Sequence, residues 1–154
     1  MSHTSPDDVI QVGQIEIRFR LTAEQTGGHV TMFEARIPAG ARVPVPHSHE
    51  AFDETAYGLA GVTTITLNGQ KLPLGPGDVV FIPCGVVHQV ENLADLEARA
   101  LNVVTPGLLG PAYFRKMSDA LRAPGPPDVG KLKAIMQRHG LRPAGGLLSS
   151  PRTS

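Results

Sequence analysis

Residues 77–92 read GDVVFIPCGVVHQVEN. The apolar run at 79–82 follows a Gly-Pro-Gly-Asp turn and has the length and composition of a buried strand. A second turn at 83–85 leads into another strand at 86–92, which carries His88. Two strands joined by a tight turn within so short a stretch indicate a β-rich domain.

The same kind of pattern extends through most of residues 10–104. Apolar and charged side chains alternate at 15–20, and β-branched runs occupy 30–37 and 62–67. Asn68-Gly69 is a hairpin signal, because both residues tolerate positive φ. Many short strands separated by Gly/Pro turns predict an all-β sandwich or barrel.

Beyond residue 105 the apolar period becomes helical. Tyr113, Met117 and Leu121 share one helix face, and a Pro/Gly-rich break separates this helix from a second one. Asp128 can cap the second helix and Gly140 can end it. We divide the chain into an N-terminal arm and strand, a barrel, a helical extension and a flexible tail, at residues 1–27, 28–105, 106–142 and 143–154.

The composition excludes several classes of protein. The chain has 154 residues, of which 41% are hydrophobic and 18% charged, as in a single globular domain. No apolar run approaches the roughly eighteen residues of a membrane-spanning helix, and no signal peptide is visible, so we expect no membrane partner. The single cysteine, Cys84, excludes an internal disulfide framework and favours a cytoplasmic location.

The charge is unevenly distributed along the chain. Residues 105–154 carry eight Lys/Arg and two acidic residues, whereas residues 1–104 carry six Lys/Arg and twelve acidic residues. A basic segment can indicate a nucleic-acid contact, but only 5% of residues are aromatic and Trp is absent, so stacking platforms are missing. We therefore expect no nucleic-acid partner and interpret the basic segment as packing on the acidic body or on a second copy.

Three histidines and a carboxylate form a pattern that suits a metal. His47 and His49 are two residues apart, so they share one face of an extended strand, and His88 lies on a strand that could run beside them. Strand parity favours Asp53 as the accompanying carboxylate, while Glu54 needs a bulge or bend, and periodicity leaves both open. Three neutral imidazoles and one carboxylate suit Fe, Mn, Ni, Cu, Co or Zn.

The segments that carry these residues resemble the two motifs of the cupin superfamily. Residues 40–61, GARVPVPHSHEAFDETAYGLAG, are similar to G(X)5HXH(X)3,4E(X)6G, with one extra residue between Gly40 and His47. Residues 77–92 match G(X)5PXG(X)2H(X)3N at every position. The resemblance covers roughly residues 28–105, and two spaced motifs in one small chain are a specific signal.

This resemblance implies an all-β, cupin-type double-stranded β-helix (a jelly-roll barrel) with a short C-terminal helical extension. It also implies one bound divalent transition metal ion, and the family's four-residue spacer selects Glu54 over Asp53. The implied metal ligands are His47, His49, Glu54 and His88. Small cupins commonly form homodimers, and the strand around Ile15–Phe19 is a candidate edge for that contact.

The implied function is that of a metal-dependent, dioxygenase-like enzyme acting on a small oxygen-rich substrate, by resemblance to small quercetin-dioxygenase-like cupins. Four protein ligands would leave two positions of an octahedral ion open. A non-oxidative isomerase, lyase or decarboxylase and a binding or sensor module without turnover are the alternatives, because one fold hosts all three. No separate catalytic residue stands out.

Strand parity also predicts a cavity beside the metal. If Glu54 points inward, the small residues Ala56 and Gly58 do too, which leaves room for an organic ligand. The aromatic residues could line its mouth or belong to the core; they are Phe33, Phe52, Tyr57 and Phe81. We interpret Cys84 as a small buried residue and not as a nucleophile, because no group that lowers a thiol pKa is evident.

Overall fold

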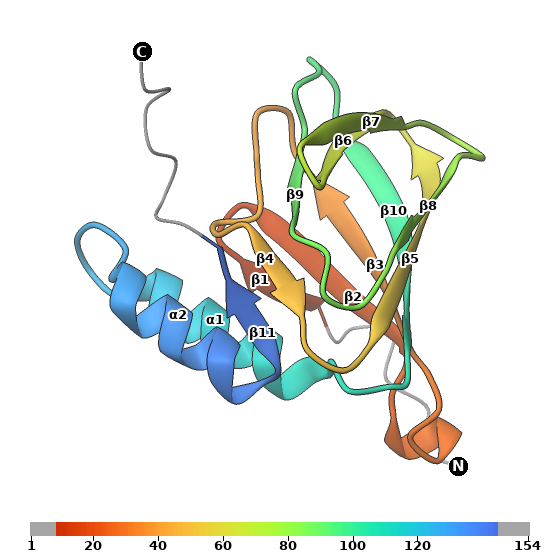
Figure 1. The fold of residues 1–154 in the computed structure, drawn as a ribbon. Helices are drawn as coiled ribbons and strands as arrows, with labels where there is room; N and C mark the ends of the chain where they lie inside the picture. Colours follow the sequence, from red (N-terminus) through yellow and green to blue (C-terminus); the bar gives the residue numbers. More distant parts are fainter. Residues whose placement is uncertain (1–8, 145–154) are drawn as a thin grey trace.

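The computed structural model describes residues 9–144 as two facing antiparallel β-sheets with two helices beside them (Figure 1). The six-stranded sheet has the order β1 (Val9–Val12), β2 (Ile15–Leu21), β3 (Thr31–Ile37), β10 (Ala98–Thr105), β5 (Asp53–Ala60) and β8 (Val79–Ile82). The five-stranded sheet has the order β11 (Leu141–Pro143), β4 (His47–His49), β9 (His88–Glu91), β6 (Thr63–Leu67) and β7 (Gln70–Leu74). The mainly-β fold and its two C-terminal helices are confirmed.

Strand alternation determines what faces the space between the sheets. In β5, Glu54, Ala56 and Gly58 are buried, whereas Tyr57 points outward and is exposed. Because successive side chains of a strand point to opposite faces, one strand contributes both the acidic group and the small residues to the interior. The inward direction predicted for Ala56 is confirmed by its place in the wall of the space between the sheets, whereas Gly58 is buried against the backbone of Gly75.

The strand at Ile15–Leu21 is not a sheet edge. It is β2, which is paired with β1 on one side and β3 on the other, and its apolar side chains belong to the core. The expectation that this strand offers a free edge to a second copy is therefore wrong, because β1 covers it. A homodimer stays a prediction.

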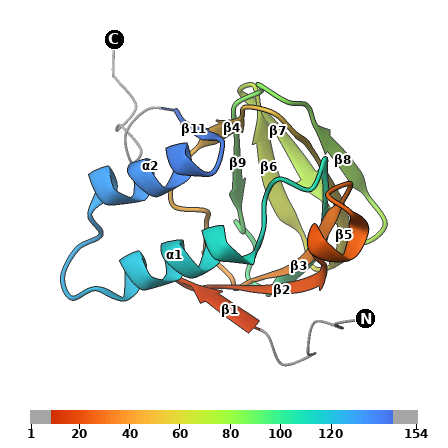
Figure 2. The same ribbon diagram turned by 90° about the horizontal axis from the view of Figure 1, so that it is seen from below.

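Both expected helices form and lie together on one side of the sheets (Figure 2). Helix α1 (Pro111–Arg122) packs beside β1, and α2 (Val129–Arg138) packs beside β11. The Asp128 carboxylate accepts a hydrogen bond from the Lys131 backbone N–H, which satisfies a free donor at the start of α2. No helix within residues 9–144 is long and apolar enough to cross a membrane.

After α2 the chain returns to the five-stranded sheet as a short strand that the sequence analysis did not predict. In β11, Leu141 pairs with His49 and Pro143 with His47, so the C-terminal segment lies along β4. The first residues of the tail predicted at 143–154 are thus ordered against the sheet, and residues 145–154 lie outside the described residues. The helical extension consequently supports the strand that carries two of the histidines.

We expect Gly58→Ala to destabilise the fold by about 1–3 kcal/mol, as overpacking does. A Cβ at Gly58 would overlap the backbone carbonyl oxygen of Gly75 and lie 2.7 Å from its carbonyl carbon, and neither atom can rotate away. Urea unfolding measures the change. Gly110→Ala is the control, because a Cβ there meets nothing within 4 Å; equal unfolding midpoints for the two variants would contradict the packing argument.

Candidate metal centre

Strands β4 and β9 bring the three predicted histidines together. His47 pairs with His88 across the sheet, and His49 lies two residues further along β4 on the same face. All three are buried, and one ring nitrogen from each lies within 4.8 Å of the others. Three buried imidazoles at this spacing could bind one ion, as zinc, copper, iron and nickel sites do.

Backbone carbonyl groups fix two of the imidazole rings. Nδ1 of His47 lies 2.9 Å from the Val45 carbonyl oxygen, and Nδ1 of His88 lies 3.0 Å from that of Val86. A carbonyl only accepts hydrogen bonds, so Nδ1 must donate and the Nε2 lone pair remains free. Metal-binding histidines are typically oriented in this way by a partner on the second nitrogen.

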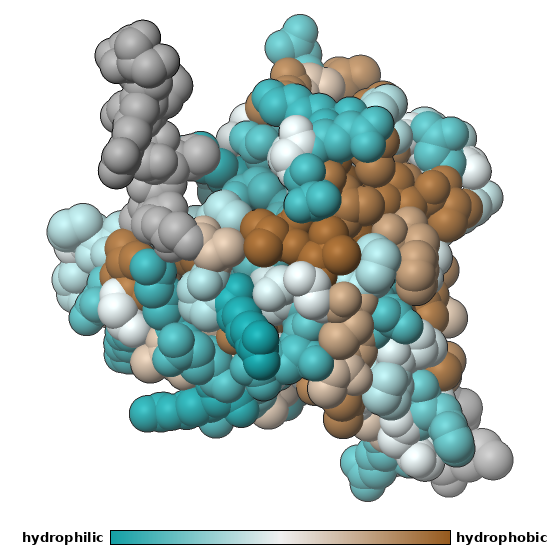
Figure 3. Space-filling model, in the orientation of Figure 1, coloured by the Kyte–Doolittle hydropathy of each residue, from teal (hydrophilic) through white to brown (hydrophobic). Residues whose placement is uncertain are grey.

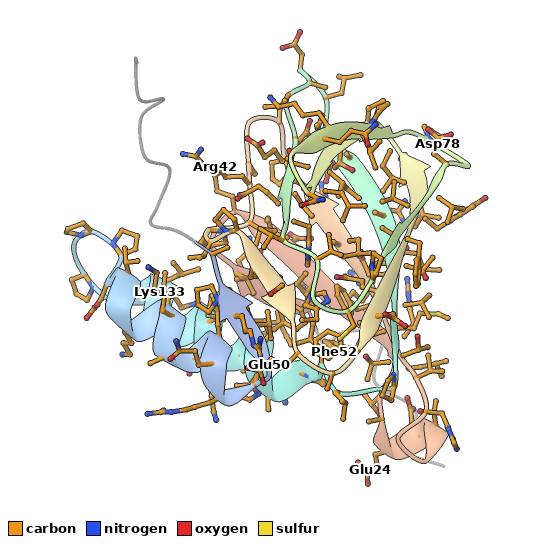
Figure 4. The ribbon with its side chains drawn as sticks, viewed as in Figure 1. Glu24, Arg42, Glu50, Phe52, Asp78 and Lys133 are labelled. Atoms are coloured by element: carbon orange, nitrogen blue, oxygen red, sulfur yellow. The ribbon has the colours of Figure 1, made fainter. Side chains whose placement is uncertain are left out.

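His49 has no such partner. It is 1% exposed, and neither of its ring nitrogens forms a hydrogen bond with any group in residues 9–144. Its ring is instead stacked on Phe52, with centroids 4.3 Å apart, at the connection between β4 and β5 (Figure 4). An unpaired polar group in the interior is costly, and a metal ion would satisfy its acceptor nitrogen.

The structure distinguishes the two candidate carboxylates. Oε2 of Glu54 lies 3.6 Å from Nε2 of His49 and 3.9 Å from Nε2 of His88. Asp53 Oδ1 instead accepts a hydrogen bond from the Cys84 backbone N–H and so fastens the β8–β9 turn. Parity counted from His49 favoured Asp53, but β4 and β5 belong to different sheets, so the chain does not keep one strand phase between them.

Burial keeps the histidines neutral. It lowers the pKa of His47 to about 3 and that of His49 to about 2, with the neighbouring imidazoles contributing, and it also lowers the pKa of His88. Burial likewise raises the pKa of Glu54 to about 7. Neutral imidazoles are the form that binds metal, and a cation beside Glu54 would restore its charged form.

We expect the metal-free protein to lose stability as the pH falls below about 6.5. Below that pH the unfolded histidines take up protons that the folded ones exclude, so folding becomes less favourable. Glu54 has the opposite effect. As the pH falls from about 7 to its ordinary pKa of 4.5, Glu54 makes folding more favourable, because the folded state binds its proton more tightly. This single carboxyl offsets only part of the loss of stability that the three histidines cause.

The urea midpoint of the metal-stripped protein, measured from about pH 8 to pH 4.5, checks this. The variant His49→Leu should show a shallower decline, because one of the three groups is gone. A midpoint that is independent of pH would contradict the neutral state of the cluster.

A cavity of about 100 Å³ between the sheets reaches His47, His49, Glu54 and His88. The predicted cavity is therefore present, and Ala56 and Phe33 line it. Gly58 does not line it, because this residue contacts the neighbouring turn instead.

Two aromatic residues considered for the cavity mouth lie outside it. Tyr57 is 42% exposed on β5, and Phe81 is 53% exposed on β8. Figure 3 shows apolar atoms gathered on the side of the molecule where Figure 1 places β8.

Cys84 is also exposed, not buried as expected, because the turn that contains it lies on the surface. Its thiol donates a hydrogen bond to the His49 carbonyl oxygen, 3.3 Å away.

Sequence reasoning missed three further polar residues of the cavity wall, one of which is Thr63 of β6. Asn102 takes an inward position of β10, between buried Ala100 and Val104, and Tyr113 comes from α1. A polar residue among the apolar inward positions of a strand is a signal that could have indicated Asn102. Nothing in the helical period of α1 separates a cavity-lining Tyr113 from an ordinary core residue.

Comparison with known proteins shows which family this chain belongs to. The family profile described as "Cupin domain" matches residues 33–104. The oxalate-binding protein of Thermotoga maritima is 30% identical over 93 residues, which are 60% of this chain and 76% of that protein. This chain belongs to the cupin superfamily.

Two further comparisons describe its relatives. Quercetin 2,3-dioxygenase of Bacillus subtilis is 35% identical over 102 residues, which are 65% of this cupin. The match spans only 29% of the length of that dioxygenase. A solved structure of a predicted oxalate decarboxylase from Thermotoga maritima has a TM-score of 0.61 at 26% identity, covering 69% of this cupin and 99% of that chain. The relatives thus include enzymes and a binding protein on one fold.

Proposed function

We propose that His47, His49, Glu54 and His88 bind one divalent transition metal ion. The observation that carries this proposal is the state of the imidazoles: two rings present a free Nε2 because Nδ1 donates to a backbone carbonyl, and the third has no hydrogen bond to any group in residues 9–144. Glu54 adds an oxygen ligand within reach of two of these rings. The set of three nitrogen atoms and one oxygen atom fits Fe, Mn, Ni, Cu, Co or Zn.

We further propose that this cupin is a metal-dependent enzyme of the dioxygenase kind. The cavity supports this proposal, because a small molecule held in it would lie directly beside the four residues. A bound ion of this kind would supply Lewis acidity and, if redox-active, electron transfer to dioxygen. The apolar wall excludes water from the substrate, and the neighbouring polar side chains orient it.

The identity to quercetin 2,3-dioxygenase supports the oxidative assignment, within the part of that enzyme that the match spans. The identity to an oxalate-binding protein, over most of that protein's length, supports the alternative of ligand binding without turnover. A non-oxidative isomerase, lyase or decarboxylase would use the same wall and ligands.

Oxygen uptake distinguishes these functions. Purified protein is reloaded separately with Fe²⁺, Mn²⁺, Ni²⁺, Cu²⁺, Co²⁺ and Zn²⁺ and given a panel of small diones, enols and carboxylic acids in an oxygen-electrode cell. The proposal predicts substrate-dependent oxygen uptake with a redox-active metal and none with His49→Leu. Product without oxygen uptake would indicate a non-oxidative enzyme, and a ligand-induced rise in Tm without product would indicate a binding protein; either result would contradict the dioxygenase assignment.

A further inference from the structure

A second cavity lies next to the one that reaches the candidate metal centre. Its volume is about 60 Å³, and half of the residues that line it also line the first cavity. The shared wall consists of Ile15, Ile17, Val43, Tyr113 and Phe114. These side chains alone therefore separate the second cavity from the space beside the histidines.

The wall of the second cavity is apolar. Among the described residues that line it, only Tyr113 has an oxygen or nitrogen atom in its side chain. A buried water molecule needs about two to four polar partners, so a cavity of this kind stays free of water. Met117 of α1 and Met136 of α2 contribute polarizable thioethers, which attract a small apolar molecule by dispersion. The wall residues that are not shared with the first cavity are Val12, Pro44, Val45, Met117 and Met136.

The volumes of the two cavities limit the size of what they hold. An apolar cavity of about 150 Å³ holds benzene, which has six carbon atoms, so one non-hydrogen atom takes about 25 Å³. By that scale the second cavity holds a molecule of about two atoms, and the first, at about 100 Å³, holds about four non-hydrogen atoms in all. An organic substrate would fill the first cavity, so dioxygen that is held nearby before it reacts needs a separate space.

The second cavity lies close both to solvent and to a candidate metal ligand. Val43, Pro44 and Phe114 are half-buried, so they meet the cavity on one side and solvent on the other. Val45 also lines the cavity, and its backbone carbonyl oxygen lies 2.9 Å from Nδ1 of His47. A small molecule in this cavity is therefore near the surface and near the histidine cluster at once.

We propose that the second cavity is a dioxygen site that supplies the candidate metal centre. Dioxygen has two atoms and no dipole, which are the size and the polarity that this wall accepts. It enters past the half-buried residues and reaches the first cavity when side chains of the shared wall change rotamer. This inference rests on the proposed dioxygenase function and adds a separate binding site for its gaseous substrate.

Paramagnetic relaxation by dioxygen locates the gas without any turnover. Full-length protein with ¹³C-labelled methyl groups is loaded with diamagnetic Zn²⁺ and equilibrated under dioxygen or, as the control, under nitrogen; the metal-stripped protein is measured in the same way. Under dioxygen, the methyl protons of Met117 and Met136 should relax several-fold faster than those of Ile10 and Val104. All four residues are buried, but Ile10 and Val104 line neither cavity.

Two variants of β1 test whether the gas occupies this cavity. Val12→Ile adds one methyl group to the wall, which leaves room for about one atom, so the faster relaxation of Met117 and Met136 should be lost. Val9→Ile makes the same change at an exposed position of the strand and should behave as the wild type does. In the oxygen-electrode assay, Val12→Ile should raise the KM for dioxygen several-fold and leave the KM for the organic substrate unchanged. The urea midpoint of each variant shows that it is folded.

The possible results separate this inference from the proposed function. Equal relaxation of the methyl groups inside and outside the wall, or fast relaxation that persists in Val12→Ile, would overturn the dioxygen site. An unchanged KM for dioxygen in Val12→Ile would overturn the role of the cavity in supply and leave the dioxygenase assignment intact. Selective relaxation without oxygen uptake on any substrate would overturn the dioxygenase assignment and the supply role with it, while the binding site itself would stand.

Discussion

The variant His49→Leu is expected to lose metal binding completely while its metal-free form remains at least as stable as the wild type. The imidazole of His49 is buried, and neither nitrogen has a hydrogen bond within the described residues. Replacement of such a group by an apolar side chain of similar size removes an unsatisfied polar group and retains contact with Phe52. The histidine is therefore costly to the fold, and metal binding is the reason we infer for its presence.

Two measurements on metal-stripped and metal-loaded samples check this expectation. Elemental analysis gives the metal content, and urea unfolding gives the stability of the stripped protein. His29→Leu is the matched control, since His29 is exposed and far from the centre in sequence; it should retain the metal. Retention of a full metal complement by His49→Leu, or a loss of several kcal/mol in its metal-free form, would contradict this account.

Leu141→Ala is expected to cost about 2–5 kcal/mol in the free energy of unfolding and to weaken metal binding. Leu141 is 1% exposed and is part of both the main core and the cavity wall. Truncation of a buried leucine loses its burial free energy and leaves a cavity. Because Leu141 also pairs with His49, movement of β11 would displace a candidate metal ligand.

Arg142→Ala is the control for this prediction. Arg142 is the next residue of β11, its side chain is 71% exposed, and its Nε donates a hydrogen bond to Glu50 Oε1 at 3.1 Å. Exposed ion pairs contribute about 0–1 kcal/mol, so this variant should unfold and bind metal almost as the wild type does. Equal urea midpoints for Leu141→Ala and Arg142→Ala would show that β11 does not support β4.

The sequence predicts the histidine cluster better than it predicts the elements around the cluster. His47 and His49 are two residues apart on one strand, so they share a face. His88 lies on the neighbouring strand, and the fold brings all three together as expected. The family motif, and not strand parity, points to the carboxylate that lies beside the imidazoles, Glu54, because parity fails where the chain passes from one sheet to the other between β4 and β5.

The features that were not predicted depend on long-range contacts. The strand β11 has three residues and contains Pro143, so it has no periodicity of its own, and only its pairing with β4 makes it a strand. Cys84 is exposed because its turn lies on the surface, where the backbone N–H of Cys84 donates to Asp53 of another strand. Cavity-lining Tyr113 looks like any buried helix residue until α1 is placed beside the sheets.

X-ray absorption of the protein reconstituted with Zn²⁺ can establish whether the three histidines bind a metal, because it counts the imidazoles around the bound ion. We expect one ion per chain with three histidine nitrogens at about 2.0–2.1 Å and oxygen completing the shell, and no bound ion in His49→Leu. A spectrum with fewer than three imidazoles, or the same spectrum from His49→Leu, would contradict this expectation.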